Sequence, residues 1–430
     1  MLRHHLVYIL SLMATLFVGS HGLSAQSIRL TTLREPGATI QLSITYQGEI
    51  TLSGVKEHYP SGKEPHEYTL SAREVVISGD VQSLRVSQAE LTSLTITDCS
   101  SLVELDCAQN SLTSLDLSQA PALTKLACFA NELTQITFPA KPLLTQLKCT
   151  NNKLSKLDLS SMTHLEELTC SNNELTALDL SALSQLKTLK CYSNKLSEID
   201  LRSCTLLEKL WCSDNQLRSL DLSSNPQLKV VWCYKNQIAQ LSHQELPQLI
   251  WLYCEDNNIE TLDCSQMPKL NKLAVHGNKI HDKAMTDLVA SLPKRTTTPG
   301  SFIAVNTRNK DEENVCTTAS ATQATEKGWQ VLDYCGGAND HQGVPYEGAT
   351  TTIESVSPSS SIQFRWSGES LVLSGLPERS AVNLYNLLGE PLYTGKSSLS
   401  GELLIQLPEH ISGPLLLTVN NQLAAKLHRP

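Results

Sequence analysis

The stretch Leu165 to Ser181, which reads LEELTCSNNELTALDLS, decides the fold. Its pattern, L-x-x-L-x-C-x-x-N-x-L-x-x-L-D-L-S, returns every 21 residues, and a degenerate copy starts at Val81. The cysteine position is filled by Cys107, Cys128, Cys149, Cys170, Cys191, Cys212, Cys233 and Cys254. The asparagine position is filled by Asn110, Asn131, Asn152, Asn173, Asn194, Asn215, Asn236, Asn257 and Asn278. Nine to ten copies without an insertion indicate a repeat protein.

A unit of 21 residues is too short to bury its own apolar side chains, so neighbouring units must stack around one continuous core. In the segment x-L-x-C-x, the alternation of period two places leucine and cysteine inside and the three x residues outside. This alternation predicts one short parallel strand in every coil. With strands about 4.8 Å apart, ten coils form a stack roughly 45 to 50 Å long.

The repeated polar and thiol positions have structural explanations. A buried asparagine amide offers two donors and an acceptor, which suit the backbone of the turn after each strand. Cysteine in the inward position behaves as a small buried apolar residue, and stacked thiols that point in parallel are poorly placed for disulfides. Metal binding or redox chemistry at these cysteines is the alternative.

A column of aspartates also follows the period. We expect these carboxylates to lie away from the strands and to cap turns through Asx-type hydrogen bonds, while a calcium ladder is the alternative. The column consists of Asp116, Asp158, Asp179, Asp200, Asp221 and Asp263.

The pattern resembles the leucine-rich-repeat family, and within it the cysteine-ladder, 21-residue (internalin J-like) subclass, over residues 81–280. The resemblance implies a curved or gently twisted solenoid used for adhesion or protein binding. The expected fold class is therefore an α/β-type repeat solenoid, mostly β and coil, with its parallel strands on the concave face.

The ends of the chain differ from the repeat. Residues 1–25, with the apolar run Leu6 to Val18, read as a signal peptide, and no other stretch is apolar enough to span a membrane. Because open solenoid ends would expose core and strand edges, we expect a β cap at 26–80 and an α/β cap at 281–335. The C-terminal cap is predicted from helices Asp282–Leu292 and Thr317–Lys327 and strands Ser301–Val305 and Trp329–Leu332.

Two features of the C-terminal cap leave alternatives open. Cys316 and Cys335 lie off the repeat and are the best disulfide candidates of the chain. The run Asp311, Glu312, Glu313 reads as a solvated acidic loop, with a calcium site as the alternative.

Residues 336–361, rich in Gly, Ser, Thr and Pro, read as a linker, and residues 362–430 as a small β-sandwich. The stretch Val382 to Gly389, Gly413 and the ending Ala425-Lys426-Leu427 resemble the C-terminal sorting domain of type IX secretion substrates. This resemblance implies export to the outer-membrane cell surface or the extracellular space, with the secretion machinery as a partner. An ordinary β accessory domain is the alternative.

Aromatic residues gather at the outward strand positions. Large rings in water mark an interaction surface, because tryptophan and tyrosine dominate binding hot spots. The alternative is a ladder of stacked rings that only rigidifies the sheet. The predicted ligand-binding residues are Phe129, Tyr192, Trp211, Trp232, Tyr234, Trp251, Tyr253 and His276.

Other classes of function find little support in the sequence. The net charge of −9, without a basic block, makes nucleic acid an unexpected partner. Motifs of hydrolases, P-loop enzymes and metal sites are missing from the sequence, so we expect no catalytic residue, no metal and no cofactor. The expected function is that of an adhesin that binds a host or bacterial protein. A surface or biofilm component that self-associates and a glycan-binding protein are the alternatives.

Overall fold

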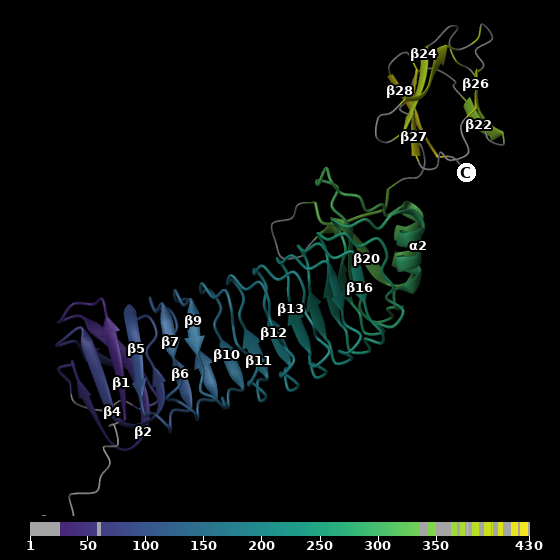
Figure 1. Ribbon diagram of the computed structural model, residues 1–430. Helices are drawn as coiled ribbons and strands as arrows, with labels where there is room; N and C mark the ends of the chain where they lie inside the picture. Colours follow the sequence, from purple (N-terminus) through teal and green to yellow (C-terminus); the bar gives the residue numbers. More distant parts are fainter. Residues whose placement is uncertain are drawn as a thin grey trace, which may run out of the picture. The chain divides into compact units, whose positions relative to one another are not determined.

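The computed structural model describes residues 26–57, 62–335 and 343–349, and beyond residue 362 the strands given below with Leu376 and Ser398. The signal peptide expected at 1–25 lies outside the described residues. The chain forms two compact units, one of residues up to 316 with 320–346, the other of residues 317–319 with 347–430. In the first unit, an N-terminal β cap, a stack of coils and an α/β cap follow one another (Figure 1).

The strands of the N-terminal cap pair with one another in antiparallel fashion. Strand β4 belongs to both the cap and the stack of coils, because it pairs antiparallel with β1 and β2 while its last residues, Ser83 to Arg85, pair in parallel with the first coil strand. The cap strands are β1 (Ser27–Thr32), β2 (Thr39–Ser53), β3 (His66–Thr69), β4 (Glu74–Arg85) and β5 (Leu91–Thr97).

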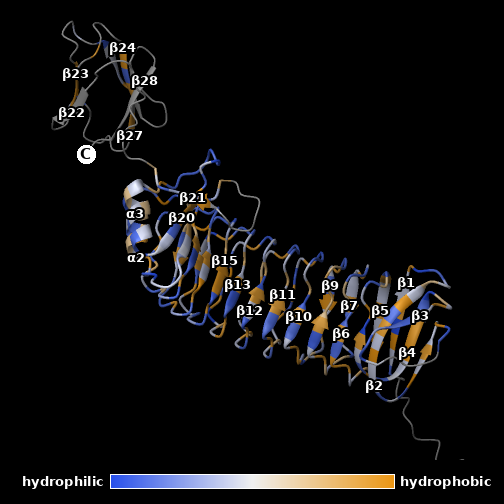
Figure 2. Cartoon of the chain, turned by 180° about the vertical axis from the view of Figure 1, so that it is seen from behind, coloured by the Kyte–Doolittle hydropathy of each residue, from blue (hydrophilic) through white to orange (hydrophobic). Residues whose placement is uncertain are grey.

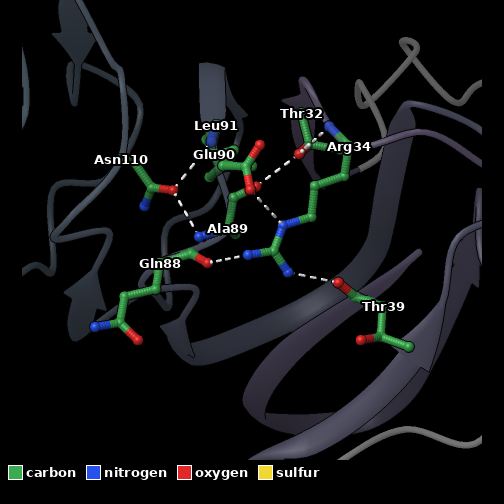
Figure 3. Close-up of polar contacts among 8 residues, drawn as sticks. All are labelled: Thr32, Arg34, Thr39, Gln88, Ala89, Glu90, Leu91 and Asn110. Atoms are coloured by element: carbon green, nitrogen blue, oxygen red, sulfur yellow. Dashed lines mark hydrogen bonds and ion pairs between the residues drawn. The ribbon is translucent and has the colours of Figure 1, made fainter.

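Arg34 fastens this cap to the first coil (Figure 3). Its guanidinium donates to the Thr39 carbonyl oxygen at 2.6 Å, to the Gln88 carbonyl oxygen at 2.7 Å and to the Glu90 carboxylate at 3.2 Å. Gln88 and Glu90 have left-handed backbone angles, with φ of 57° and 53°. Positive φ angles are sterically unfavourable, most of all for β-branched or bulky residues. The planar guanidinium of Arg34 therefore stabilises this turn through its hydrogen bonds.

The coils form one parallel ladder in exact register. Each strand residue pairs with the residue 21 positions later, as Leu147 does with Leu168. Leucine and cysteine point inward, and all eight ladder cysteines are fully buried thiols, which confirms the prediction of reduced core cysteines. Hydrophilic and hydrophobic segments lie side by side along the coils (Figure 2). After β4, the ladder consists of β6 (Glu104–Asp106), β8 (Lys125–Ala127), β10 (Gln146–Lys148), β11 (Glu167–Thr169), β12 (Thr188–Lys190), β13 (Lys209–Trp211), β15 (Val230–Trp232), β17 (Trp251–Tyr253) and β18 (Lys272–Ala274).

The asparagine column joins each coil to the coil before it. Asn173 accepts a hydrogen bond from Leu154 N at 3.0 Å and donates to the carbonyl oxygens of Cys149, Cys170 and Ser171 at 3.0, 3.1 and 3.2 Å. The side chain therefore uses both its donors and its acceptor on backbone groups, which confirms the structural explanation of this column.

The aspartate column caps turns as expected. Asp179 accepts from Ser181 N at 2.9 Å, and Asp116 and Asp221 make the same contact two residues on. Hydrogen bonds from the side chains of Ser181 and Ser223, and then from their backbone N–H groups, lower the pKa of Asp179 and Asp221. The expectation that the column avoids strands is wrong for Asp116 and Asp221, because they end strands of two small parallel sheets. These sheets are formed by β7 (Ser114–Asp116) with β9 (Gln135–Thr137), and by β14 (Ser219–Asp221) with β16 (Gln240–Ser242).

The C-terminal cap continues the parallel ladder, because β18 pairs with β19 and β19 with β20. Asn314 takes over the role of the asparagine column, accepting from Ile280 N at 2.8 Å and donating to the Val275 and Ala304 carbonyl oxygens at 2.8 and 3.0 Å. The elements are α2 (Asp282–Ser291), β19 (Gly300–Val305), α3 (Thr318–Glu326), β20 (Trp329–Asp333) and β21 (Val344–Pro345).

No disulfide joins Cys316 and Cys335, the pair considered from the sequence. The two cysteines occupy different kinds of position. Cys316 lies two residues after Asn314, where the repeat places an inward leucine, and it is fully buried. Cys335 instead occupies a left-handed turn after β20, with φ of 49°.

The acidic loop is not fully solvated, contrary to the prediction. Glu312 is half-buried and its carboxylate accepts from Gly277 N at 2.9 Å, Asn306 N at 2.7 Å and Asn314 N at 3.0 Å. Burial raises the pKa of this carboxyl despite these hydrogen bonds. Glu312 therefore connects the turn of the last coil, at Gly277, to the cap residues Asn306 and Asn314 through hydrogen bonds.

The second unit is a β-sandwich, as predicted. Its two antiparallel sheets enclose a core of Leu371, Leu373, Leu376, Val382, Leu384, Ile405, Leu415 and Leu417. Residues 344–345, within the stretch assigned to the linker, form β21, which pairs with β20. Both strands belong to the first unit. One sheet contains β22 (Gln363–Ser367), β23 (Ser370–Ser374) and β26 (Leu403–Gln406), and the other contains β24 (Ala381–Asn386), β25 (Pro391–Lys396), β27 (Pro414–Val419) and β28 (Gln422–His428). Within the described residues, no helix is long and apolar enough to cross a membrane.

Candidate functional site on the outer strand face

The outer strand face comprises the side chains that the main parallel ladder turns away from the core. Its central column places four residues of successive strands side by side, because Lys190 pairs with Trp211, Trp211 with Trp232, and Trp232 with Tyr253. The Trp211 and Trp232 rings stack with centroids 4.6 Å apart and an interplanar angle of 9°. Tyr253 continues the stack at 5.7 Å from Trp232, tilted by 35°.

Lysine ammonium groups lie over two of the indoles. Lys190 Nζ is 3.7 Å from the centroid of the Trp211 ring. Lys190 and Trp232 lie on the two strands that flank the Trp211 strand, so both faces of the Trp211 ring are covered. Lys272 Nζ is 4.7 Å from the centroid of Trp251. Such contacts between cations and aromatic rings are attractive and hold the long lysine side chains in place.

Five of the predicted residues lie half-buried on neighbouring coils of this face, and we call them the aromatic patch. It consists of Tyr192, Trp211, Trp232, Tyr234 and Trp251, all of them half-buried. Tyr234 joins the patch through Trp232, at a centroid distance of 6.5 Å. Phe129 is also half-buried on this face, but it lies three coils before Tyr192 and outside the patch.

The prediction that Tyr253 and His276 face solvent is wrong. Tyr253 is 6% exposed and His276 only 2%, and His276 stacks on Tyr334 of the cap at 4.3 Å. The cause is the cap, whose strands β19 and β20 extend the face beyond the last coil. Tyr253 belongs to a small outer cluster with Ala274, Ile303 and Leu332. Burial raises the pKa of Tyr253 to about 12.

Three residues of this face were not among the predicted ligand-binding residues. Glu255 is buried beside the patch, at 3% exposure, and Lys190 and Lys272 contact its rings. A signal for Lys190 was available, because it stands 21 residues before Trp211 and so one strand away. The burial of Glu255 had no such signal in the repeat pattern.

Within the part of the chain that the structure describes, no three His, Cys, Asp or Glu side chains gather as a metal site would require. Desolvation raises the pKa of the ladder thiols, to about 12 for Cys107, Cys149 and Cys191. The groups that the outer strand face presents to a ligand are aromatic rings, hydroxyl groups and ammonium groups.

No family model and no curated protein matches the chain. Among solved structures, the functional domain of InlJ from Listeria monocytogenes, which includes a cysteine ladder, matches 82% of this chain and 90% of its own length. Its identity is 19% and its TM-score 0.29. The leucine-rich-repeat domain of APL1B matches 46% of this chain and 61% of its own length, at 23% identity and a TM-score of 0.40. An internalin, InlF, from Listeria monocytogenes str. 4b F2365 matches 48% of this chain and 77% of its own length, at 19% identity and a TM-score of 0.34.

These low TM-scores add nothing to what the coil geometry establishes. The parallel ladder, its inward leucines and its asparagine column are the features of one architecture. The fold is a leucine-rich-repeat solenoid.

Proposed function

We propose that this protein is a non-catalytic recognition module that binds another protein through the aromatic patch. The observation that carries the proposal is the aromatic patch, whose half-buried rings lie on β13, β15 and β17 or just after β12 and β15, at positions that the core does not need. Burying such a ring in a complex contributes roughly 2 to 4 kcal/mol when it acts as a hot spot. An adhesin of the cell surface or the extracellular space would use the patch in this way.

The proposed location rests on sequence features alone. The signal peptide expected at 1–25 and the sorting-domain resemblance around Val382 to Gly389 support export and recognition by the secretion machinery. The stacking of Trp211 on Trp232 also matches the alternative in which the rings rigidify the sheet. Both roles are compatible, because a rigid group of rings loses little entropy on binding.

A pull-down with matched variants tests the proposal. The full chain is immobilised and exposed to lysates of bacterial and host cells, with the double variant W211A/W232A beside it. Phe129→Ala is the control, because it removes a ring of the same face outside the patch. We expect captured proteins to disappear with W211A/W232A and to remain with Phe129→Ala, while circular dichroism shows that both variants are folded.

Equal capture by the wild type and W211A/W232A would contradict the proposal. Sedimentation of the purified protein separates the rival structural role, since oligomers that grow with concentration and depend on Trp211 and Trp232 would indicate self-association. Retention on glycan arrays with the same dependence would indicate a sugar ligand.

A further inference from the structure

Lysines of the coils are commonly neutralised by a glutamate one coil away. Lys153 pairs with Glu132 at 3.0 Å, and Lys195 with Glu174 at 3.1 Å. Two more pairs follow the same spacing, Lys187 with Glu166 and Lys229 with Glu208, each at 2.7 Å. The 21-residue period thus places opposite charges on adjacent coils.

The aromatic patch departs from this rule. Strands β12, β13, β15, β17 and β18 contain Lys190, Lys209 and Lys272 and no acidic residue. None of these three lysines forms an ion pair with a residue that the structure describes, and Lys190 and Lys272 lie over indoles instead. Earlier strands of the same face mix the charges, as the Arg85 to Asp106 and Lys148 to Glu167 pairs show.

These positive charges stand out because the whole chain carries a net charge of −9. Burial lowers the pKa of Lys190, the Glu167 carboxylate on the preceding strand acts in the opposite direction, and Lys209 and Lys148 lower it further. A negative group brought to the patch would therefore meet three lysines that form no direct ion pair with a described residue. Complementary charges of this kind set partner choice and association rate.

We propose that the partner docks on the aromatic patch through an extended acidic segment of protein, whose carboxylates pair with Lys190, Lys209 and Lys272 and whose apolar side chains contact the indoles. This inference rests on the proposed function and specifies its ligand.

The spacing of the lysines constrains this segment. Lys190 and Lys272 lie four strands apart along the ladder, because β12, β13, β15, β17 and β18 are consecutive neighbours. At about 4.8 Å per strand, this separation is roughly 19 Å, which an extended chain covers in about six residues. Two acidic residues about six positions apart, with apolar or aromatic residues between them, fit the patch.

The chemistry of the patch favours protein over sugar. Around Trp211 and Trp232, the neighbouring strand positions are Lys209, Val230 and Trp251, which supply an ammonium group and apolar surface. Sugar hydroxyls need acceptors as well as donors, whereas these five strands carry no carboxylate or amide side chain. Acidic side chains on a peptide need only donors.

Selection of peptides from a phage library of random twelve-residue sequences tests the inference. The full-length protein is the bait, and W211A/W232A removes peptides that do not need the patch. We expect the selected peptides to be rich in Asp or Glu together with aromatic or aliphatic residues. The best peptide is then synthesised, and its affinity is measured by fluorescence anisotropy.

Two triple variants with the same change in net charge provide the decisive comparison. K190Q/K209Q/K272Q removes the patch lysines, and K153Q/K195Q/K283Q removes lysines that are ion-paired elsewhere. We expect the first to weaken peptide binding at least about tenfold and the second less than about twofold, with the difference shrinking at high salt.

The possible outcomes separate this inference from the proposed function. Neutral or basic peptides that still need Trp211 and Trp232 would overturn the acidic segment and leave protein recognition intact. Alginate, a polyuronate, is tested in parallel, and lysine-dependent binding of alginate without any selected peptide would overturn the inference in favour of an acidic glycan. If neither binds, the acidic segment is rejected, and the pull-down alone decides the proposed function.

Discussion

The ring of Trp211 stacks on the ring of Trp232 at 4.6 Å, with a 9° angle between their planes. This contact follows from the period, because residues 21 positions apart occupy adjacent strands in register. Each ring therefore contributes to the stability of the solenoid as well as to the exposed patch. The consequence is that a ring cannot be removed without some cost to folding.

A double-mutant cycle of Trp211→Ala, Trp232→Ala and the double variant should reveal this coupling. We expect each single variant to lower the free energy of unfolding and the cycle to give an interaction energy of about 0.5 to 1.5 kcal/mol, the range of aromatic pairs. Urea denaturation provides the measurement. Strictly additive effects would show that the stack contributes nothing beyond the burial of each ring.

Asn173→Asp should destabilise the solenoid far more than Asn172→Asp, although both add one negative charge. The carboxylate at 173 would face the carbonyl oxygens of Cys149, Cys170 and Ser171, now without a donor. Asn172 is exposed, and its amide contacts the Asn151 side chain at 2.7 Å. We expect a loss of about 3 to 5 kcal/mol for the first variant and within about 0.5 kcal/mol for the second. If denaturant titrations gave similar losses of unfolding free energy for the two variants, the asparagine column would not contribute to stability as argued.

The core thiols should be inert in the native protein. At pH 8 we expect a thiol reagent to modify only Cys335, which is partly exposed, and to reach all thirteen cysteines after unfolding. Cys335→Ser is the control and should abolish the native reaction. Rapid modification of several thiols without denaturant would mean that the coils open.

These thiols should also limit stability in alkali. Burial raises the pKa of Cys107, Cys149 and Cys191 to about 12, whereas unfolded cysteine ionises near pH 8.5. Because the folded pKa is the higher one, their contribution is fully present below the unfolded pKa and is lost as pH rises toward 12. Melting temperatures measured between pH 7 and 11 should fall above about pH 8.5. Cys191→Ala should reduce the slope of this fall.

A column of left-handed residues precedes the asparagines, and it predicts opposite effects of two substitutions. Ala130 has φ of 53°, which costs an alanine about 1 kcal/mol, so Ala130→Gly should be neutral to stabilising by up to about 1 kcal/mol. At Gly277, with φ of 66°, an added Cβ would lie 2.3 Å from Asp256 Oδ1, so Gly277→Ala should destabilise by about 1 to 3 kcal/mol. Thermal denaturation of the two variants checks the signs, and a stabilising Gly277→Ala would contradict the strain.

The sequence was sufficient for the features that repeat. Leucine, cysteine and asparagine at fixed positions specify the register, and the α2 helix begins at Asp282 as predicted and ends at Ser291, one residue before the predicted Leu292. The strand β19 begins at Gly300, one residue before the prediction. Local patterns and turn residues carry enough information for such elements.

Features that depend on the cap were beyond sequence reasoning. Asn314 follows Asn278 by 36 residues and not 21, because α2 and β19 intervene, so its column could not be recognised. The burial of Tyr253 and His276 likewise depends on strands that come later in the chain, and on Tyr334. Periodicity reports which side a residue faces, but it does not report what another segment places over that side.

The unbroken register also bears on how the molecule can change in length. Because each coil contacts its neighbours through the same hydrogen bonds, a deletion or duplication of 21 codons upstream of Tyr192 would rejoin the ladder in phase. Each such event would move the two caps apart or together by about 4.8 Å. The reach of the protein could therefore evolve in steps while its aromatic patch stays intact.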